Sequence, residues 1–186
     1  MIGATAFAQP HDGHWWQSTV SYQRQEYLNG YMDCAIYDGE RRDLPSIPTN
    51  EIEQAIQTFY EAHPKALNTP AIKVLDFVSK QRGMHRKPPE GGEQWTDKHG
   101  YYDGEYWPIS KMEQIGFVQG LRDCYAALPS GLRFSRSDDF YVRHISIWYA
   151  SHRHKLHTKI ANVLAIYVDH KTEDAPTSPK QTGPTT

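Results

Sequence analysis

The chain has 186 residues and a formal net charge of −2, so it is long enough for one substantial hydrophobic core or two small ones. A charge this close to zero excludes the strong positive field by which proteins attract nucleic acid or an anionic membrane surface. Apolar residues make up only 38% of the chain, and none of their runs approaches the roughly 18 residues of a transmembrane helix. We therefore expect neither a nucleic-acid partner nor a membrane span.

The first ten residues, "MIGATAFAQP", end in a pattern typical of a cleavage site. Ala6-Phe7-Ala8 has the small-x-small form that signal peptidase cuts. Too few residues precede it for a charged segment and a full apolar segment, so either the true start lies upstream or the match is due to chance. We interpret residues 1–10 as the remnant of a signal peptide, which predicts a periplasmic or secreted bacterial protein.

Three blocks recur in the same order about 90 residues further along the chain. They are "DGHWW" at 12–16 and "DGEYW" at 103–107, Gly-x-x-Asp-Cys at 30–34 and 120–124, and the segments 56–75 and 145–164. Chance could produce one such block but hardly three in order. The pattern predicts a tandem duplication, with helical repeat 1 over residues 11–82 and helical repeat 2 over residues 102–169.

Each repeat contains three segments in which apolar residues recur with the period of a helix. In repeat 1 the predicted helices carry Tyr27, Leu28, Tyr31, Cys34 and Ala35, then Ile52, Ile56, Phe59 and Tyr60, and then Ala71, Val74, Leu75 and Val78. In repeat 2 they carry Phe117, Val118, Leu121, Cys124 and Tyr125, then Tyr141, Ile145, Trp148 and Tyr149, and then Ile160, Val163, Leu164 and Tyr167. No segment alternates long enough to indicate a sheet. The predicted fold is all-α, with two similar three-helix halves packed about a pseudo-two-fold axis.

The predicted helix starts carry capping signals. Ser110-x-x-Glu113 is a capping box, in which two side chains satisfy backbone N–H groups reciprocally. Thr69 followed by Pro70 predicts an N-cap with proline at the first helical position, and Thr158 is predicted to cap the matching helix.

The segments outside the predicted helices have simpler interpretations. Trp16 and Trp107 precede the first long helix of each repeat; a carbohydrate or peptide platform could use them, but their matched positions favour packing onto their own half. Residues 83–101 are rich in proline and glycine and are predicted to be a linker. Residues 170–186 form a Pro/Thr-rich tail that we expect to be disordered.

The first long helix of each repeat carries a strip of small residues. Gly30 and Cys34 are one turn apart, as are Gly120 and Cys124. Such strips let two helix backbones approach closely, and this gain offsets the roughly 1 kcal/mol that an interior glycine costs relative to alanine. We therefore predict that the two strips face one another at the centre of the molecule. The two cysteines would then form a single disulfide; alternatively, each is a small buried apolar residue in its own half.

Repeat 1 resembles the type VI amidase immunity (Tai) family and its resistance-associated relatives. Tyr27 to Asp33 matches the aromatic-Val-x-Gly-x-x-Asp helix of that family, Pro45 to Thr49 matches its proline-containing loop, and Tyr60 to Ala71 matches its His-Pro-x-x-Leu ending. Repeat 2 keeps Leu156-His157 and Ala161 but has Arg153 in place of the proline. The resemblance covers about 130 residues when both repeats are counted.

This resemblance implies a small helical periplasmic protein that binds and blocks a peptidoglycan amidase delivered by type VI secretion. Family members often act as homodimers, so a duplicated chain is expected to be an intramolecular pseudo-dimer and thus a monomer. No inhibitory residue can be carried over, because the match fails in the contact loops. We expect any inhibitory surface to lie in the loops 38–49 and 126–137, which differ most between the two repeats. The alternative is a structural or ligand-binding helical domain without inhibitory activity.

Two sets of side chains invite a chemical interpretation. The first is a group of histidines that lie in one stretch of the chain, namely His144, His152, His154, His157 and His170. His154 and His157 have a spacing that zinc sites use, but no neighbouring cysteine or carboxylate completes a tetrahedron, which favours solvated or capping histidines.

Asp33 and Asp123 could pair for acid–base work, or each could accept hydrogen bonds within its own half. We favour the second interpretation, and the chain carries no nucleophile elbow, phosphate-binding loop or dinucleotide fingerprint. The sequence therefore predicts a protein that is not an enzyme, with no catalytic residue, no metal and no cofactor.

Overall fold

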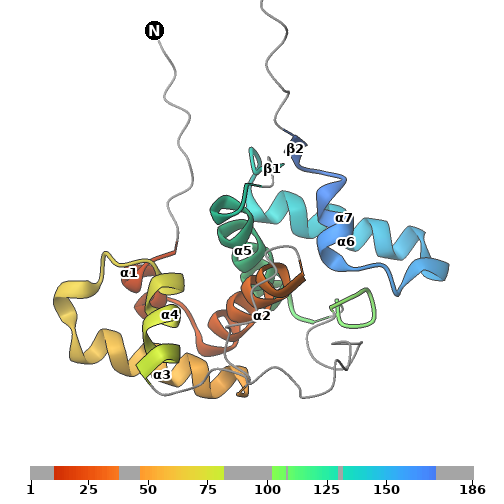
Figure 1. Cartoon of the computed structure of the whole chain (residues 1–186). Coiled ribbons are helices and arrows are strands. Elements are labelled where there is room, and N and C mark those ends of the chain that lie inside the picture. Colours follow the sequence, from red (N-terminus) through yellow and green to blue (C-terminus); the bar gives the residue numbers. More distant parts are fainter. Residues whose placement is uncertain (1–10, 38–46, 82–101, 108, 130–131, 171–186) are drawn as a thin grey trace, which may run out of the picture.

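The computed structural model describes residues 11–37, 47–81, 102–107, 109–129 and 132–170 (Figure 1). The predicted signal-peptide remnant and linker lie outside these residues, as does the predicted tail beyond residue 170. The prediction of an all-α fold is confirmed for the described chain.

The described residues form seven α-helices, two short 3-10 helices and one pair of two-residue strands. Residues 11–81, here called the first half, contain α1 (Gly13–Ser18), α2 (Ser21–Tyr37), α3 (Thr49–Ala62), η1 (Pro64–Ala66) and α4 (Ala71–Gln81). Residues 102–170, here called the second half, contain α5 (Lys111–Ala127), β1 (Leu132–Arg133), α6 (Asp138–Ser151), η2 (Arg153–Lys155), α7 (Ile160–Ala165) and β2 (Asp169–His170).

The three helices predicted in each half correspond to α2, α3 and α4 and to α5, α6 and α7. Helix α1 is an addition that the periodicity did not predict. It forms because the side chain of Asp12 accepts hydrogen bonds from the backbone N–H groups of His14 and Trp15, at 3.0 and 3.1 Å. The predicted capping box at the start of α5 is confirmed, with Ser110 and Glu113 bonding reciprocally.

Two details of the last helix were predicted wrongly. Helix α7 ends at Ala165, so Tyr167 lies beyond it and is only partly buried. The chain turns there toward β2, which pairs antiparallel with β1. Thr158 does not cap α7; the N-cap is Lys159, which makes no capping bond with its side chain. Instead the N–H of Ile160 donates to the carbonyl of Tyr102 at 3.0 Å, so a neighbouring backbone satisfies the start of the helix.

Helices α2 and α5 lie side by side at the centre of the molecule (Figure 1). Their backbones touch, because a Cβ atom added at Gly30 would overlap the carbonyl of Phe117, and one added at Gly120 would overlap the carbonyl of Tyr27. The two helices run in the same direction, since their starts meet where Tyr22 bonds to Met112 and their last turns meet at the cysteines. The small-residue strips thus face each other as predicted.

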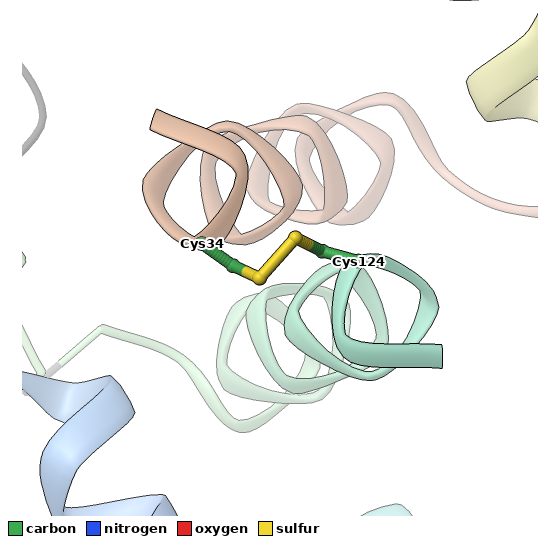
Figure 2. The surroundings of a disulfide bond; sticks show 2 residues. All are labelled: Cys34 and Cys124. Carbon is green, nitrogen blue, oxygen red and sulfur yellow. A yellow bond between two sulfur atoms is a disulfide. The ribbon is translucent and has the colours of Figure 1, made fainter. Parts of the chain in front are cut away.

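A disulfide joins Cys34 of α2 to Cys124 of α5 (Figure 2). The Cα atoms of the two cysteines are 6.1 Å apart, and 90 residues separate them in sequence. Both side chains are buried against the core. A loop of this length corresponds to roughly 4–5 kcal/mol of stabilisation by the chain-entropy estimate.

The remaining helices flank the central pair. Helices α1, α3 and α4 lie on one side of it, and α6 and α7 lie on the other (Figure 1). Buried apolar residues from both halves form one continuous cluster. The largest fully buried side chains in it include Trp16, Tyr27, Tyr60, Phe117, Tyr141, Leu75 and Ile145. In the described part of the chain, every helix is too short or too polar to cross a membrane.

The turn that follows α3 and the turn that follows α6 are built by the same contacts. Tyr60 donates to the carbonyl of Thr69 at 2.8 Å, and Tyr149 donates to the carbonyl of Thr158 at 2.7 Å. The backbone N–H groups of Gly13 and Gly104 reach into these turns, where they donate to the carbonyls of Leu67 and Leu156 at 2.8 and 2.7 Å. A Cβ atom at either glycine would overlap the ring of Tyr60 or Tyr149, so both positions need glycine.

Candidate functional site

Polar side chains are buried along the contact between the two halves, and the first group centres on Asp123 of α5. Its Oδ2 atom accepts from the backbone N–H of His11 at 2.9 Å and from the hydroxyl of Tyr27 at 2.8 Å, and it lies 3.0 Å from Nδ1 of His11. All these partners belong to the first half. Our prediction that Asp123 finds its partners in its own half is therefore wrong, because the close approach of α2 and α5 turns Asp123 into the opposite half.

This arrangement does not resemble an acid–base pair. Asp33 is buried on α2, and within the described residues it is not among the contacts of Asp123. The pKa of Tyr27 is raised well above its usual value, first by burial and then by the charge of Asp123, so Tyr27 keeps its proton and remains a donor. The group holds His11, at the start of the first half, against α5 of the second half.

The second group centres on Glu26 of α2, which is 8% exposed. The hydroxyl of Tyr106, from the segment before α5, donates to the Glu26 carboxylate and lies 2.7 Å from each of its oxygens. The amide of Asn29 donates to Oε1 at 3.1 Å, and Thr49 at the start of α3 donates to Asn29 at 2.8 Å. The group therefore connects α2, α3 and the second half.

Burial raises the pKa of Glu26 above its usual value. The hydrogen bonds from Tyr106 and Asn29 oppose this shift, while the charge of Glu113 adds to it. A carboxyl group with a raised pKa can serve as a general acid where substrate can reach it. Here the carboxylate is buried and bonded to Tyr106, so Glu26 links the two halves instead.

A third group joins the elements of the first half. The guanidinium of Arg24 donates to Glu53 at 2.7 Å and to the carbonyls of Trp16 and Thr19 at 2.9 and 2.7 Å. Both charged side chains are mostly buried. In the second half, Arg122 of α5 pairs with Asp138 at the start of α6.

Sequence reasoning missed Glu26 and Tyr106 as well as the pair of Arg24 and Glu53. One signal was available for Tyr106. It replaces Trp15 at the matching position of the repeated block, and a hydroxyl on a buried ring indicates a polar partner. Nothing in the periodicity indicated that Glu26 faces the second half, since the contact depends on how the two halves pack.

The histidines interact mainly with their own helices. Nδ1 of His144 lies 2.8 Å from the carbonyl oxygen of Phe140, and Nδ1 of His152 lies 2.8 Å from that of Trp148. Each ring also lies against the aromatic ring four residues earlier. His63 repeats this arrangement in the first half, at 2.8 Å from the carbonyl of Phe59.

His154 and His157, whose spacing is one that zinc sites use, lie next to different residues. Nδ1 of His157 lies 3.2 Å from Asp103, whereas the ring of His154 lies 6.3 Å from that of His152. Within the described residues, no group of three or more His, Cys, Asp or Glu side chains could hold a metal ion. His170 belongs to β2.

The two tryptophans of the repeated blocks are buried inside their own halves. Trp16 packs against Tyr27 and Tyr60, and Nε1 of Trp107 donates to the hydroxyl of Ser146 at 2.9 Å. These contacts agree with packing rather than with an exposed binding platform.

Comparison with known proteins adds no relative. No family model, no curated protein and no solved structure matches the chain.

Proposed function

We propose that this chain is an exported helical binding protein that inhibits a peptidoglycan amidase, as its resemblance to amidase immunity proteins implies. The observation that carries the proposal is that the motif between Tyr60 and Ala71 forms one structural unit. Tyr60 bonds to the carbonyl of Thr69, Leu67 accepts from Gly13, and the N–H of Ala71 donates to His11 at 2.8 Å. The motif thus holds residues 11–13 against the hairpin formed by α3 and α4. This arrangement supports a shared fold with that family.

We further propose that the two halves arose by duplication and are related by a pseudo-two-fold axis. Matching contacts in the two turns support this, as does the meeting of matched residues along α2 and α5, where Cys34 bonds to Cys124. Near such an axis, equivalent residues come together. A chain that contains both halves has already formed the dimer interface, so we propose that it acts as a monomer.

Export to the periplasm or beyond is supported by the disulfide. A bridge between Cys34 and Cys124 persists in oxidising compartments and is rare where glutathione keeps thiols reduced. An inhibitor of a cell-wall enzyme has to act in such a compartment. The resemblance and the disulfide therefore favour the same location, from independent features of the chain.

A binding role is also favoured over catalysis by the state of the buried polar groups. Asp123 and Glu26 each accept hydrogen bonds from side chains of the opposite half. Groups held in this way stabilise the contact between the halves. The inhibitory surface proposed in the loops stays a prediction, because residues 38–46 and 130–131 of those loops lie outside the described residues.

The test is inhibition by the purified full chain with its disulfide intact. Peptidoglycan amidases of the class that type VI secretion delivers are mixed with the chain, and release of peptide from peptidoglycan is measured. We expect an equimolar amount to abolish the activity of one such amidase and to elute with it as a complex. If every amidase keeps its full activity with the chain in excess, the amidase proposal fails and a structural or ligand-binding role takes its place.

A further inference from the structure

The turn between α6 and α7 carries more exposed positive charge than the matching turn of the first half. Arg153, His154 and Lys155 make up η2, and all three are exposed. The matching η1 consists of Pro64, Lys65 and Ala66. The chain as a whole has a net charge of −2, so this basic turn is a local feature.

Folding of the turn does not need these charges. The contacts that build it, from Tyr149 and Gly104, are the same as those that build the turn of the first half without them. Among the described residues, no carboxylate lies within ion-pair distance of Arg153 or Lys155. Two cations that are exposed and unused by the fold are available to a partner.

Apolar side chains occupy the last two turns of α6, which lead into η2. Trp148 is partly buried and stacks on His152, with ring centroids 4.5 Å apart, and His152 directly precedes η2. Ile147 is 54% exposed, although the matching position in α3 is the polar Thr58. Tryptophan and arginine are enriched among the residues that dominate binding at protein interfaces.

We propose that this surface, defined as Ile147, Trp148 and residues 152–155, is the docking site for an acidic face of a protein partner. The proposal rests on the binding role proposed above and adds a contact surface to the one expected in the loops. Charge complementarity explains Arg153 and Lys155, because opposite charges steer association and fix orientation. The exposed Ile147 indicates a protein rather than an anionic polymer, since a polymer of phosphates gains nothing from an isoleucine.

The experiment uses the full chain with its disulfide intact and a short fluorescein-labelled peptide that alternates glutamate and leucine. Fluorescence anisotropy measures the affinity of the peptide over a range of salt concentrations. We expect Arg153→Glu with Lys155→Glu to weaken binding roughly tenfold or more at low salt, because like charges then face the peptide. Ile147→Thr, which installs the residue of the first half, should weaken binding and leave its salt dependence unchanged.

The matched control is Lys65→Glu, a charge reversal in η1. It should change the affinity by less than about twofold, because an isolated exposed charge away from the contact contributes little. Thermal unfolding of each variant confirms that the fold is retained. Lack of binding by the unchanged chain, or equal binding by the Arg153/Lys155 variant, would overturn the proposal.

Inorganic polyphosphate is tested as a competitor. If it displaces the peptide while Ile147→Thr has no effect, the site takes anionic polymers and the protein partner is refuted. Amidase inhibition is measured on the same variants. Peptide binding through η2 without inhibition of any amidase refutes only the amidase; inhibition that survives the double charge reversal refutes only this surface.

Discussion

The two halves share a framework of backbone contacts but differ in the side chains that cross between them. In both halves a glycine N–H and a tyrosine hydroxyl hold the turn after the second long helix. Across the central contact, however, His11 and Tyr27 of the first half donate to Asp123, whereas Tyr106 of the second half donates to Glu26.

This difference separates two kinds of matched position. Gly30 and Gly120, which both contact backbone of the opposite helix, are the same residue in both halves because only glycine fits there. Other positions at the contact differ, although the bridged cysteines do not: Tyr27 matches Phe117, and Glu26 matches Gly116. Under the duplication proposed above, each half is free to change in this way, because each face of the contact has only one partner to fit.

The largest expected effect comes from breaking the covalent link between the halves. Replacing both Cys34 and Cys124 by alanine should lower the free energy of unfolding by about 4 kcal/mol, because the unfolded chain regains the entropy of a long loop. Urea unfolding measures this loss. Reductant should destabilise the unchanged chain by a similar amount and should not affect the variant; equal effects on both would mean that the bridge is absent.

Next in size is the contact between the two helix backbones. Gly120→Ala should lower the free energy of unfolding by about 3 kcal/mol, since its Cβ would meet the carbonyl of Tyr27 and force α2 and α5 apart. The sign of the change in the free energy of unfolding distinguishes a tight contact from an ordinary helix position. At a helix position without such a contact, replacing glycine by alanine gains up to roughly 1 kcal/mol. A stabilised variant would therefore contradict the close packing of α2 and α5.

The sequence predicts the helices and the central pair more fully than it predicts the polar groups. The period of Tyr27, Leu28, Tyr31 and Cys34 reflects a local rule, namely that one face of a helix is buried, and it can be read without a structure. The glycine strips carried the further information that two helices approach closely. Both features were predictable because each depends on a short stretch of chain.

The partners of Asp123 and Glu26 depend instead on the register of α2 against α5. A shift of one turn would bring other side chains to Tyr27 and Tyr106, and the helical period within either repeat does not set that register. The end of α7 at Ala165 is likewise decided by pairing of β2 with β1, which are far apart in the chain. Contacts of this kind follow from tertiary packing and were therefore missed.

A smaller change makes the first half resemble the second. Tyr27→Phe installs the residue found at the matching position, Phe117, and removes one donor to Asp123. We expect a loss of about 1.5 kcal/mol, the usual contribution of a hydrogen bond to a charged group. The reverse exchange, Phe117→Tyr, is the matched comparison. If Tyr27→Phe leaves the free energy of unfolding unchanged, the hydrogen bond to Asp123 does not distinguish the halves.

The smallest expected effect depends on pH and concerns the buried carboxyl group of Glu26, which bonds to Tyr106. Because burial raises the pKa of Glu26, the folded chain binds this proton more tightly than the unfolded chain does. The stability linked to the proton is fully present below the usual pKa of glutamate and is lost as the pH rises through the raised value. Glu26→Gln carries no such proton, and its amide oxygen can still accept from Tyr106.

The variant should therefore become more stable relative to the unchanged chain as the pH increases from acidic to neutral. Thermal unfolding across that range measures the difference, with Glu61→Gln, at an exposed position of α3, as the control for removing one negative charge. A difference between Glu26→Gln and the unchanged chain that stays constant with pH would mean that Glu26 is not buried against Tyr106 in solution.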